Sequence, residues 1–153
     1  VGVSFGGMLA TEMAKEDKLM NVIIIASNKS SAEFPAYLRV GKYLPVYKWL
    51  PEKLIKNQTV LNWVLGVEKD EQRKLIAAII ADTDPLFLKC AIDAILHWKE
   101  TNIPLNVKHI HGTADMLLPY RLTNPDHTIE GGTHVMTLYK HKEISALLCK
   151  LIA

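Results

Sequence analysis

The pattern Gly-x-Ser-x-Gly at residues 2–6 constrains the fold of this chain more than any other feature. It lies where an apolar strand end, containing Val1 and Val3, passes directly into a helix-like run. Such a turn holds its central residue in a strained backbone conformation, at about 1–3 kcal/mol. We expect the glycines two positions before and after Ser4 to let strand and helix pass closely. The Ser4 hydroxyl then projects from the turn, and the backbone N–H of Phe5 lies at a helix N-terminus, where negative charge is favoured.

Two later segments carry the side chains that a serine nucleophile needs. Residues 111–115 read His-Gly-Thr-Ala-Asp and follow an apolar alternating run, and residues 131–134 read Gly-Gly-Thr-His. The chain order is serine, aspartate, histidine, which is the order of α/β-hydrolases and differs from that of two protease families with the same geometry. The sequence resembles the C-terminal part of a lid-bearing, esterase-like α/β-hydrolase, starting at the nucleophile elbow. The resemblance covers the whole chain, residues 1–153.

The resemblance implies an α/β fold, in which the C-terminal portion of a mostly parallel sheet is flanked by helices and carries a helical lid. Residues 1–28 and 83–153 would form an incomplete hydrolase core, and residues 29–82 the lid. The family's N-terminal strands, and the loop that lends a second oxyanion N–H, have no counterpart here, so we interpret the sequence as a fragment. We expect the fragment alone to be nearly inactive, because one missing donor lowers the rate by roughly 10²–10³.

The resemblance gives each matching residue a role. Ser4 would be the nucleophile, because a serine hydroxyl beside a base can attack a carbonyl. His134 would be that base and would later protonate the leaving group. Asp115 would fix the tautomer of the imidazole and stabilise the imidazolium. Phe5 would give its backbone N–H to the oxyanion hole, and its side chain is either pocket wall or core.

Each of these residues also has a simpler interpretation. Ser4 could be an ordinary serine in a glycine-rich turn, His134 a surface histidine, and Asp115 a turn residue, for which aspartate is common. Asp126 competes with Asp115 as the acid, although Pro125 beside it is typical of a plain turn. The order and spacing of the three segments favour the catalytic interpretation, with Asp115 as the acid.

Hydrophobic periodicity predicts the individual elements. The β-branched run at residues 22–25 is typical of a strand buried on both faces. Asp84 followed by Pro85 predicts a helix start, and the apolar rows of that helix suit packing against the sheet. The other expected elements are helices at residues 5–15, 69–81 and 144–152 and strands at residues 105–111 and 128–130.

The predicted lid holds most of the large aromatic side chains. These are Tyr43, Tyr47, Trp49 and Trp63, interspersed with Lys42, Lys48, Lys53 and Lys56. Such a cluster covers the active-site cleft, rests on a membrane surface, or packs in an unrelated way. We favour the cleft and expect no membrane partner. Close to the candidate site residues, Met116, Leu117 and Met136 either line the pocket or pack in the core.

Composition excludes other classes of function. A net charge of +2 is too small and too scattered to indicate nucleic-acid binding. Cys90 and Cys149 fall in helical runs and are expected to be buried, so nothing indicates an oxidising compartment and we expect a cytoplasmic protein. No apolar run reaches the about 18 residues that a membrane span requires.

His109 and His111 share one face of a predicted strand, which suggests a metal site with Asp115 and His134. A histidine before the glycine of the acid-bearing turn is common in the resembling family without a metal. We therefore expect no metal and no organic cofactor. The partner implied is a small-molecule substrate, and the sequence leaves the oligomeric state open.

The predicted function is hydrolysis of an ester or a related carboxylic acid derivative through an acyl-enzyme. C–C bond hydrolase and peptidase activities remain open, because the fold supports them too. A ligand-binding or non-catalytic protein on an α/β-hydrolase scaffold also remains open, although a pure binder has no physical need for all three side chains.

Overall fold

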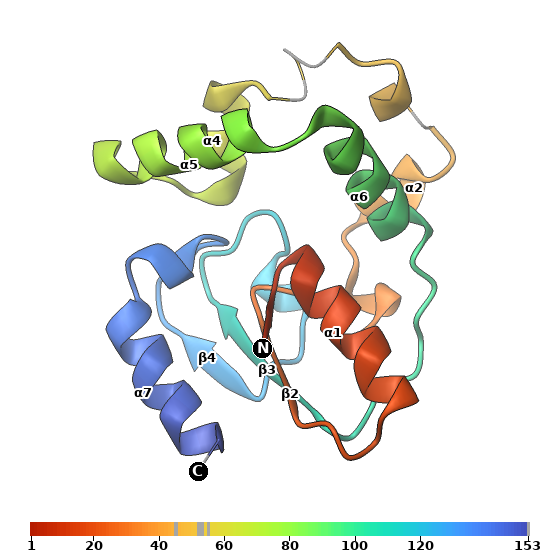
Figure 1. Cartoon of the computed structure of the whole chain (residues 1–153), viewed down its shortest axis with the longest axis vertical. Helices are drawn as coiled ribbons and strands as arrows, with labels where there is room; N and C mark the ends of the chain where they lie inside the picture. Colours follow the sequence, from red (N-terminus) through yellow and green to blue (C-terminus); the bar gives the residue numbers. More distant parts are fainter. Residues whose placement is uncertain (45, 52–53, 55, 153) are drawn as a thin grey trace.

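The computed structural model describes residues 1–44, 46–51, 54 and 56–152, so that Lys53 of the predicted lid lies outside the described residues. A sheet of four parallel strands forms its centre, in the order β1-β2-β3-β4 (Figure 1). The strands are β1 Gly2–Val3, β2 Val22–Ile25, β3 Val107–Gly112 and β4 His127–Ile129. The predicted parallel sheet flanked by helices is therefore confirmed.

The side chains of β2 alternate between two cores, because successive residues of a strand point to opposite faces. Ile25 belongs to the core on one face, which is covered by α7 (His141–Ile152). Ile24 packs on the other face with Ala14 of α1 (Phe5–Glu16). Figure 1 shows the strands between these two helices. The β-branched run is thus buried on both sides, as expected of a parallel strand.

The strand register brings the carboxyl ends of the strands to one edge of the sheet. Val3 pairs with Ile25, Ile25 with Ile110, and Ile110 with His127. Because all four strands are parallel, the segments that follow them leave from the same edge. These segments carry all three residues of the predicted serine, aspartate and histidine set.

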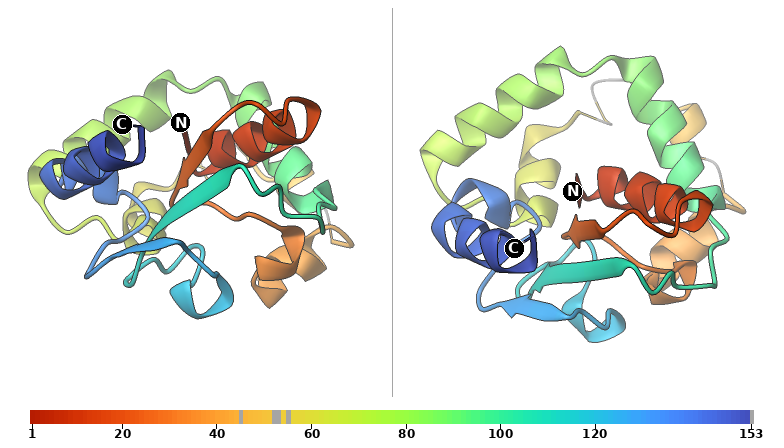
Figure 2. Two further views of the ribbon diagram at one scale, coloured as in Figure 1. Left: turned by 90° about the horizontal axis from the view of Figure 1, so that it is seen from below. Right: turned by 60° about the horizontal axis from the view of Figure 1, so that its bottom comes forward.

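A layer of helices lies over this edge. Between β2 and β3 the chain forms η1 Ser31–Glu33, α2 Ala36–Gly41, η2 Val46–Lys48, α4 Gln58–Leu65, α5 Asp70–Asp82 and α6 Pro85–His97. In Figure 1, α4, α5 and α6 span the top of the molecule, above the start of α1. The right view of Figure 2 shows α5 and α6 above α1 and the strands. Two short turns near the sheet complete the fold, η3 Tyr120–Leu122 and η4 Met136–Leu138.

Helix α6 begins as the sequence predicts but packs elsewhere. Asp84 Oδ1 accepts a hydrogen bond from the Phe87 N–H at 2.8 Å, and Pro85 occupies the first turn. Instead of covering the sheet, α6 contacts α2 and η2, and Phe87 is exposed. An amphipathic pattern predicts that one face is buried, but it does not identify the element that covers it. The division between core and lid at residue 82 stays a prediction.

Cys90 and Cys149 are both exposed, so the expectation that they are buried is wrong. Each lies on a helix whose apolar stripe is wide enough to include the cysteine in the sequence pattern, whereas the packed face is narrower. Among the described helices, none combines the length and apolar character needed to cross a bilayer.

Candidate active site

Ser4 occupies a strained turn between β1 and α1. Its φ of 51° and ψ of −123° lie outside the regions that non-glycine residues commonly adopt. The Ser4 N–H donates to the Ile25 carbonyl at 3.0 Å. Its carbonyl accepts from the Gly7 N–H at 2.9 Å and from the Ser27 hydroxyl at 2.8 Å. Without these three hydrogen bonds the strained backbone of Ser4 would relax to a more common conformation, so they hold it in place.

The steric need for glycine falls on Gly2 and Gly7. A Cβ on Gly2 would lie 2.3 Å from the carbonyl oxygen of Gly6, and a Cβ on Gly7 would lie 2.5 Å from the Ser27 Cβ. A Cβ on Gly6 would meet nothing within 4 Å. The expected role is therefore correct for Gly2 and wrong for Gly6. Gly7 takes that role because it, rather than Gly6, faces the end of β2.

Ser27 also supports the turn, although no sequence motif identifies it. Since Val3 pairs with Ile25, the residue two positions beyond Ile25 comes to lie beside Ser4. That register is the signal that could have identified Ser27 from the sequence.

Two hydrogen-bonding distances link the three predicted catalytic residues. Oγ of Ser4 lies 2.8 Å from Nε2 of His134, and Nδ1 of His134 lies 2.9 Å from Oδ2 of Asp115. A carboxylate can only accept hydrogen bonds, so Nδ1 carries the hydrogen and Nε2 presents its lone pair to the Ser4 hydroxyl. The hydroxyl therefore donates to an imidazole that is oriented to take its proton.

Asp115 is held on both of its oxygens. Oδ2 faces His134, while Oδ1 accepts the Leu118 N–H at 2.8 Å. The side chain is buried, with Asp115 4% and His134 5% exposed. Because interactions between charges are stronger away from water, this carboxylate can stabilise a positive imidazole efficiently.

Glycines let the loop of His134 come close to the end of β3. A Cβ on Gly112 would lie 2.1 Å from the carbonyl oxygen of Gly132, and Ala114 donates its N–H to that same oxygen at 2.9 Å. Gly131 has a φ of 64°, which favours glycine. The Gly-Gly pair thus places His134 beside Asp115.

Tyr139 secures the same loop from α7's side, and its role was not evident from the sequence. The Thr133 N–H donates to the Tyr139 hydroxyl at 2.6 Å, and that hydroxyl lies 3.3 Å from the carbonyl oxygen of Gly131. Thr133 immediately precedes His134, so these bonds fix the backbone that carries the imidazole. A tyrosine five residues after the histidine is the only sequence sign of this role.

The backbone N–H of Phe5 lies at the start of α1. Within the described residues it donates no hydrogen bond to the protein. A free N–H at a helix N-terminus beside the Ser4 hydroxyl can bind an oxygen that gains negative charge. The Phe5 side chain is half-buried.

His109 and His111 form a buried pair beneath Asp115. The Leu118 carbonyl lies 2.8 Å from Nε2 of His111, and Nδ1 of His111 lies 3.0 Å from Nε2 of His109. A carbonyl can only accept, so His111 donates from Nε2 and, when neutral, accepts at Nδ1. Burial lowers the pKa of His109 to about 3, and it also lowers the pKa of His111. Both rings are therefore neutral at neutral pH.

This pair does not form a metal centre with the other candidates. The described residues contain no group of three or more His, Cys, Asp and Glu side chains placed to hold a metal ion. His111 instead fixes the Leu118 peptide, whose N–H holds Asp115.

Asp126 has a different environment from Asp115. Its Oδ2 accepts the backbone N–H of His109 at 2.9 Å and lies 3.3 Å from Nζ of Lys29. Burial works to raise the pKa of Asp126, but these two contacts together hold it below its ordinary value. Asp126 thus braces the middle of β3, and His134 pairs with Asp115.

The three flanking residues have three different environments. Met136 is fully buried in the core under α7, whereas Met116 is half exposed. Leu117 lines a cavity of about 350 Å³ among α2, α4, α5 and α6. None of the aromatic residues of the cluster lines that cavity: Tyr43, Trp49 and Trp63 are exposed, and Tyr47 is buried elsewhere.

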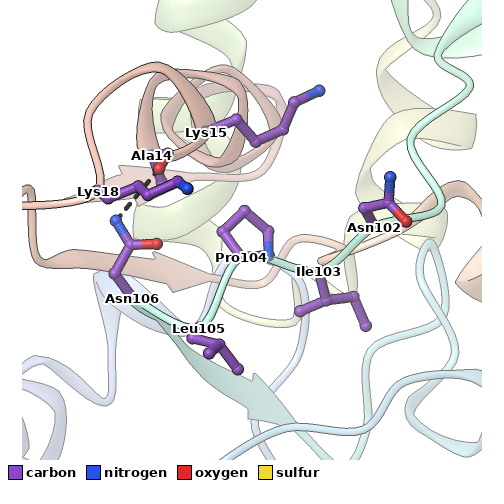
Figure 3. A pocket seen from close by; sticks show the side chains of 8 residues that line it. All are labelled: Ala14, Lys15, Lys18, Asn102, Ile103, Pro104, Leu105 and Asn106. Carbon is purple, nitrogen blue, oxygen red and sulfur yellow. Dashed lines mark hydrogen bonds between the residues drawn. The ribbon is translucent and has the colours of Figure 1, made fainter.

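A second cavity, of about 490 Å³, lies at the opposite edge of the sheet (Figure 3). It is bounded by the end of α1 and by the segment that leads into β3, including Lys18, Ile103 and Leu105. Asn106, which also lines it, donates from Nδ2 to the Met20 carbonyl at 2.6 Å and to the Ala14 carbonyl at 3.2 Å. These bonds close the end of α1, and Ser4 is at the other end of that helix.

Comparison with solved structures identifies the architecture. A protein described as a non-heme bromoperoxidase, from Mycobacterium tuberculosis, is 15% identical with a TM-score of 0.65, over 99% of this chain and 65% of its own. An α/β-hydrolase from a deep-sea metagenome of the Medee basin is 14% identical with a TM-score of 0.62, over 99% and 63%. A thermophilic esterase is 14% identical with a TM-score of 0.60, over 99% and 64%.

No protein-family model matches the sequence, and no curated protein matches it significantly. The chain spans less than two thirds of the length of each of these three structures. It has the α/β-hydrolase fold, and the similar structures are hydrolase-fold enzymes.

Proposed function

We propose that the protein is a serine hydrolase that cleaves an ester or a related carboxylic acid derivative through an acyl-enzyme. The observation that carries the proposal is the hydrogen-bonded sequence from the Ser4 hydroxyl through His134 to Asp115, at 2.8 and 2.9 Å. Fold alone does not choose a reaction, since one fold supports many activities. The proposal therefore rests on these side chains.

In the proposed reaction, each of these groups takes part in acyl transfer. Oγ of Ser4 attacks the substrate carbonyl carbon while its proton passes to Nε2 of His134. Asp115 stabilises the imidazolium that forms, and the Phe5 N–H binds the developing oxyanion. When the tetrahedral intermediate collapses, Nε2 returns the proton to the leaving-group oxygen and the acyl group stays on Ser4. Water then attacks the acyl carbon while Nε2 of His134 takes its proton. When this second intermediate collapses, the bond from the acyl carbon to Oγ breaks, Nε2 returns the proton to Oγ of Ser4, and the acid leaves.

The strained conformation of Ser4 also favours catalysis over simple binding. Strain persists only where surrounding contacts maintain it, and here the Ile25 carbonyl, the Gly7 N–H and the Ser27 hydroxyl do so. A binding protein gains nothing from a hydroxyl held toward an oriented imidazole.

Covalent labelling tests the proposal. The natural gene product that carries this chain would be incubated with a fluorophosphonate probe, and labelling would be read by intact mass. We expect one adduct in the wild type, none in Ser4→Ala, and an unchanged adduct in Ser145→Ala, since Ser145 is exposed on α7.

A folded wild type that stays unlabelled would favour a binding protein on this scaffold. Labelling that persists in Ser4→Ala would assign the nucleophile elsewhere. Hydrolysis of p-nitrophenyl esters, thioesters and anilides by the same preparations would then rank the bond types.

A further inference from the structure

A cavity of about 350 Å³, here called the lid cavity, lies among the helices between β2 and β3. Its walls come from four helices, with Leu38 on α2, Leu61 on α4, Ile80 on α5 and Ile92 on α6. Leu117, from the loop after β3, also lines it. The volume is at the lower end of the range for ligand pockets.

The lining of this cavity is aliphatic. Nine of its ten lining residues are leucine or isoleucine, and the tenth is Thr83. The Thr83 hydroxyl donates to the Ile79 carbonyl at 2.7 Å, so it is already used within α5. The described lining therefore offers no charge, no unpaired polar group and no aromatic ring to a ligand. An aliphatic chain is the group whose transfer from water such a surface favours.

One wall of the cavity comes from the loop that carries Asp115, and another wall adjoins the loop that carries His134. Leu117 is two residues from Asp115, and its carbonyl accepts the hydroxyl of Tyr37 from α2. At the other side, Leu65 lines the cavity and precedes Gly66. A Cβ on Gly66 would lie 2.6 Å from the Cβ of Thr133, the residue before His134. The lid cavity thus adjoins the loops of both the acid and the imidazole.

We propose that this cavity binds the unbranched aliphatic acyl chain of the substrate, whose carbonyl carbon lies at Ser4. The inference rests on the proposed hydrolase function and names its substrate class. A volume of about 350 Å³ holds on the order of ten methylene-sized groups, if each takes about the room of a liquid water molecule. The expected substrates are esters of medium-chain fatty acids, rather than acetates, aromatic acids or diacids.

A chain-length series with matched variants tests this assignment. The natural gene product would be assayed for kcat/KM on p-nitrophenyl esters from C2 to C16. Each methylene that enters the cavity is expected to raise kcat/KM by up to about fourfold, with the increase ending near C10. A profile that peaks at C2, or that stays flat, overturns the proposal.

Two substitutions should move the optimum in opposite directions. Leu88→Trp on α6 fills part of the cavity and should shorten the preferred chain by about two carbons. Leu61→Ala on α4 enlarges it and should lengthen the preferred chain. Leu86→Trp is the matched control, because Leu86 lies on the same helix but is exposed. Loss of structure alone would lower all rates together, whereas a shift in opposite directions requires that the chain occupies this cavity.

Binding without turnover separates this inference from the proposed function. In Ser4→Ala, calorimetry with decanoic acid should detect binding that Leu88→Trp weakens tenfold or more and that Leu86→Trp leaves unchanged. Such binding in a protein that neither labels nor hydrolyses would retain the cavity assignment and reject the hydrolase. Ester hydrolysis by the wild type, with no decanoate binding in Ser4→Ala, would retain the hydrolase function and reject the cavity assignment.

Discussion

Nε2 of His134 lies 2.8 Å from Oγ of Ser4, although the two residues follow strands at opposite ends of the four-strand order. Three interstrand spacings of about 4.8 Å separate β1 from β4, or about 14 Å in all. The loop after β4 must therefore turn back across β3 to deliver the imidazole. It does so where Gly112 and Gly132 leave no room for a Cβ between them.

Two adjacent glycines of the turn should respond differently to alanine. Gly7→Ala forces a Cβ to 2.5 Å from Ser27 and should destabilise the fold by about 1–3 kcal/mol, as overpacking does. Gly6→Ala enters open space in a helix and should change stability by less than about 1 kcal/mol, with a gain as the favoured sign. Urea unfolding of both variants measures the difference. Equal effects would contradict the contact with Ser27.

Asp115→Asn should abolish most activity while the fold survives. An amide at this position no longer fixes Nδ1 of His134 as the protonated nitrogen, and loss of the correct tautomer lowers kcat by about 10⁴ in the best-known serine triad. Asp126→Asn retains an oxygen for the His109 N–H and should stay within about threefold of wild type. Steady-state kinetics would compare the two. The acid would be reassigned if Asp126→Asn were the more damaging change.

Removing the Tyr139 hydroxyl should loosen the loop that carries His134. Tyr139→Phe leaves the Thr133 N–H without its 2.6 Å partner, so we expect about 1–2 kcal/mol less stability and a kcat reduced tenfold or more. KM should change little, because Tyr139 does not line the lid cavity. Tyr120→Phe is the control, since its hydroxyl makes only a 3.5 Å contact with Thr128. Identical kinetics in both variants would show that the Tyr139 hydroxyl does not position His134.

The buried histidine pair should make the fold sensitive to acid. His109 has an unfolded pKa of about 6.5 and a folded pKa of about 3, lowered mainly by burial and then by the charges of His111 and Lys29, against Asp126. The unfolded chain thus binds the extra proton first as the pH falls. The stabilisation that depends on a neutral His109 is fully present above about pH 6.5. It is lost progressively as the pH falls to about 3, and the free energy of unfolding then decreases by up to about 1.4 kcal/mol per pH unit.

His109→Phe should therefore flatten the dependence of unfolding free energy on pH within that window. Urea midpoints at half-unit pH steps would measure it. His127→Phe serves as the comparison, because His127 is half-buried and lies on β4, the strand next to β3. Parallel curves for wild type and His109→Phe would show that His109 is not buried as a neutral ring.

The sequence predicted the layered fold because its strongest signals are local. Three segments each fix a backbone conformation through nearby residues alone: the β-branched run of β2, the cap at Asp84 and the Gly-x-Ser-x-Gly turn. The meeting of Ser4, Asp115 and His134 then follows from parallel strands, whose carboxyl ends share one edge. Their catalytic roles stay a prediction until the labelling experiment is done.

The remaining features depend on contacts between distant segments, which a pattern does not identify. Periodicity marked the apolar rows of α6, but Ile92 faces the lid cavity and the helix packs on α2. Aromatic content favoured a helical face over the cleft, which stays a prediction, and it did not reveal that Tyr47 is buried while Trp49 is 83% exposed. The supporting hydroxyls of Ser27 and Tyr139 act on backbone groups, so no motif reveals them.

The helices between β2 and β3 approach the candidate site at two points: the Tyr37 hydroxyl donates to the Leu117 carbonyl, and Gly66 lies close to Thr133. The positions of the Asp115 and His134 loops therefore depend on the helices between β2 and β3 as well as on the sheet.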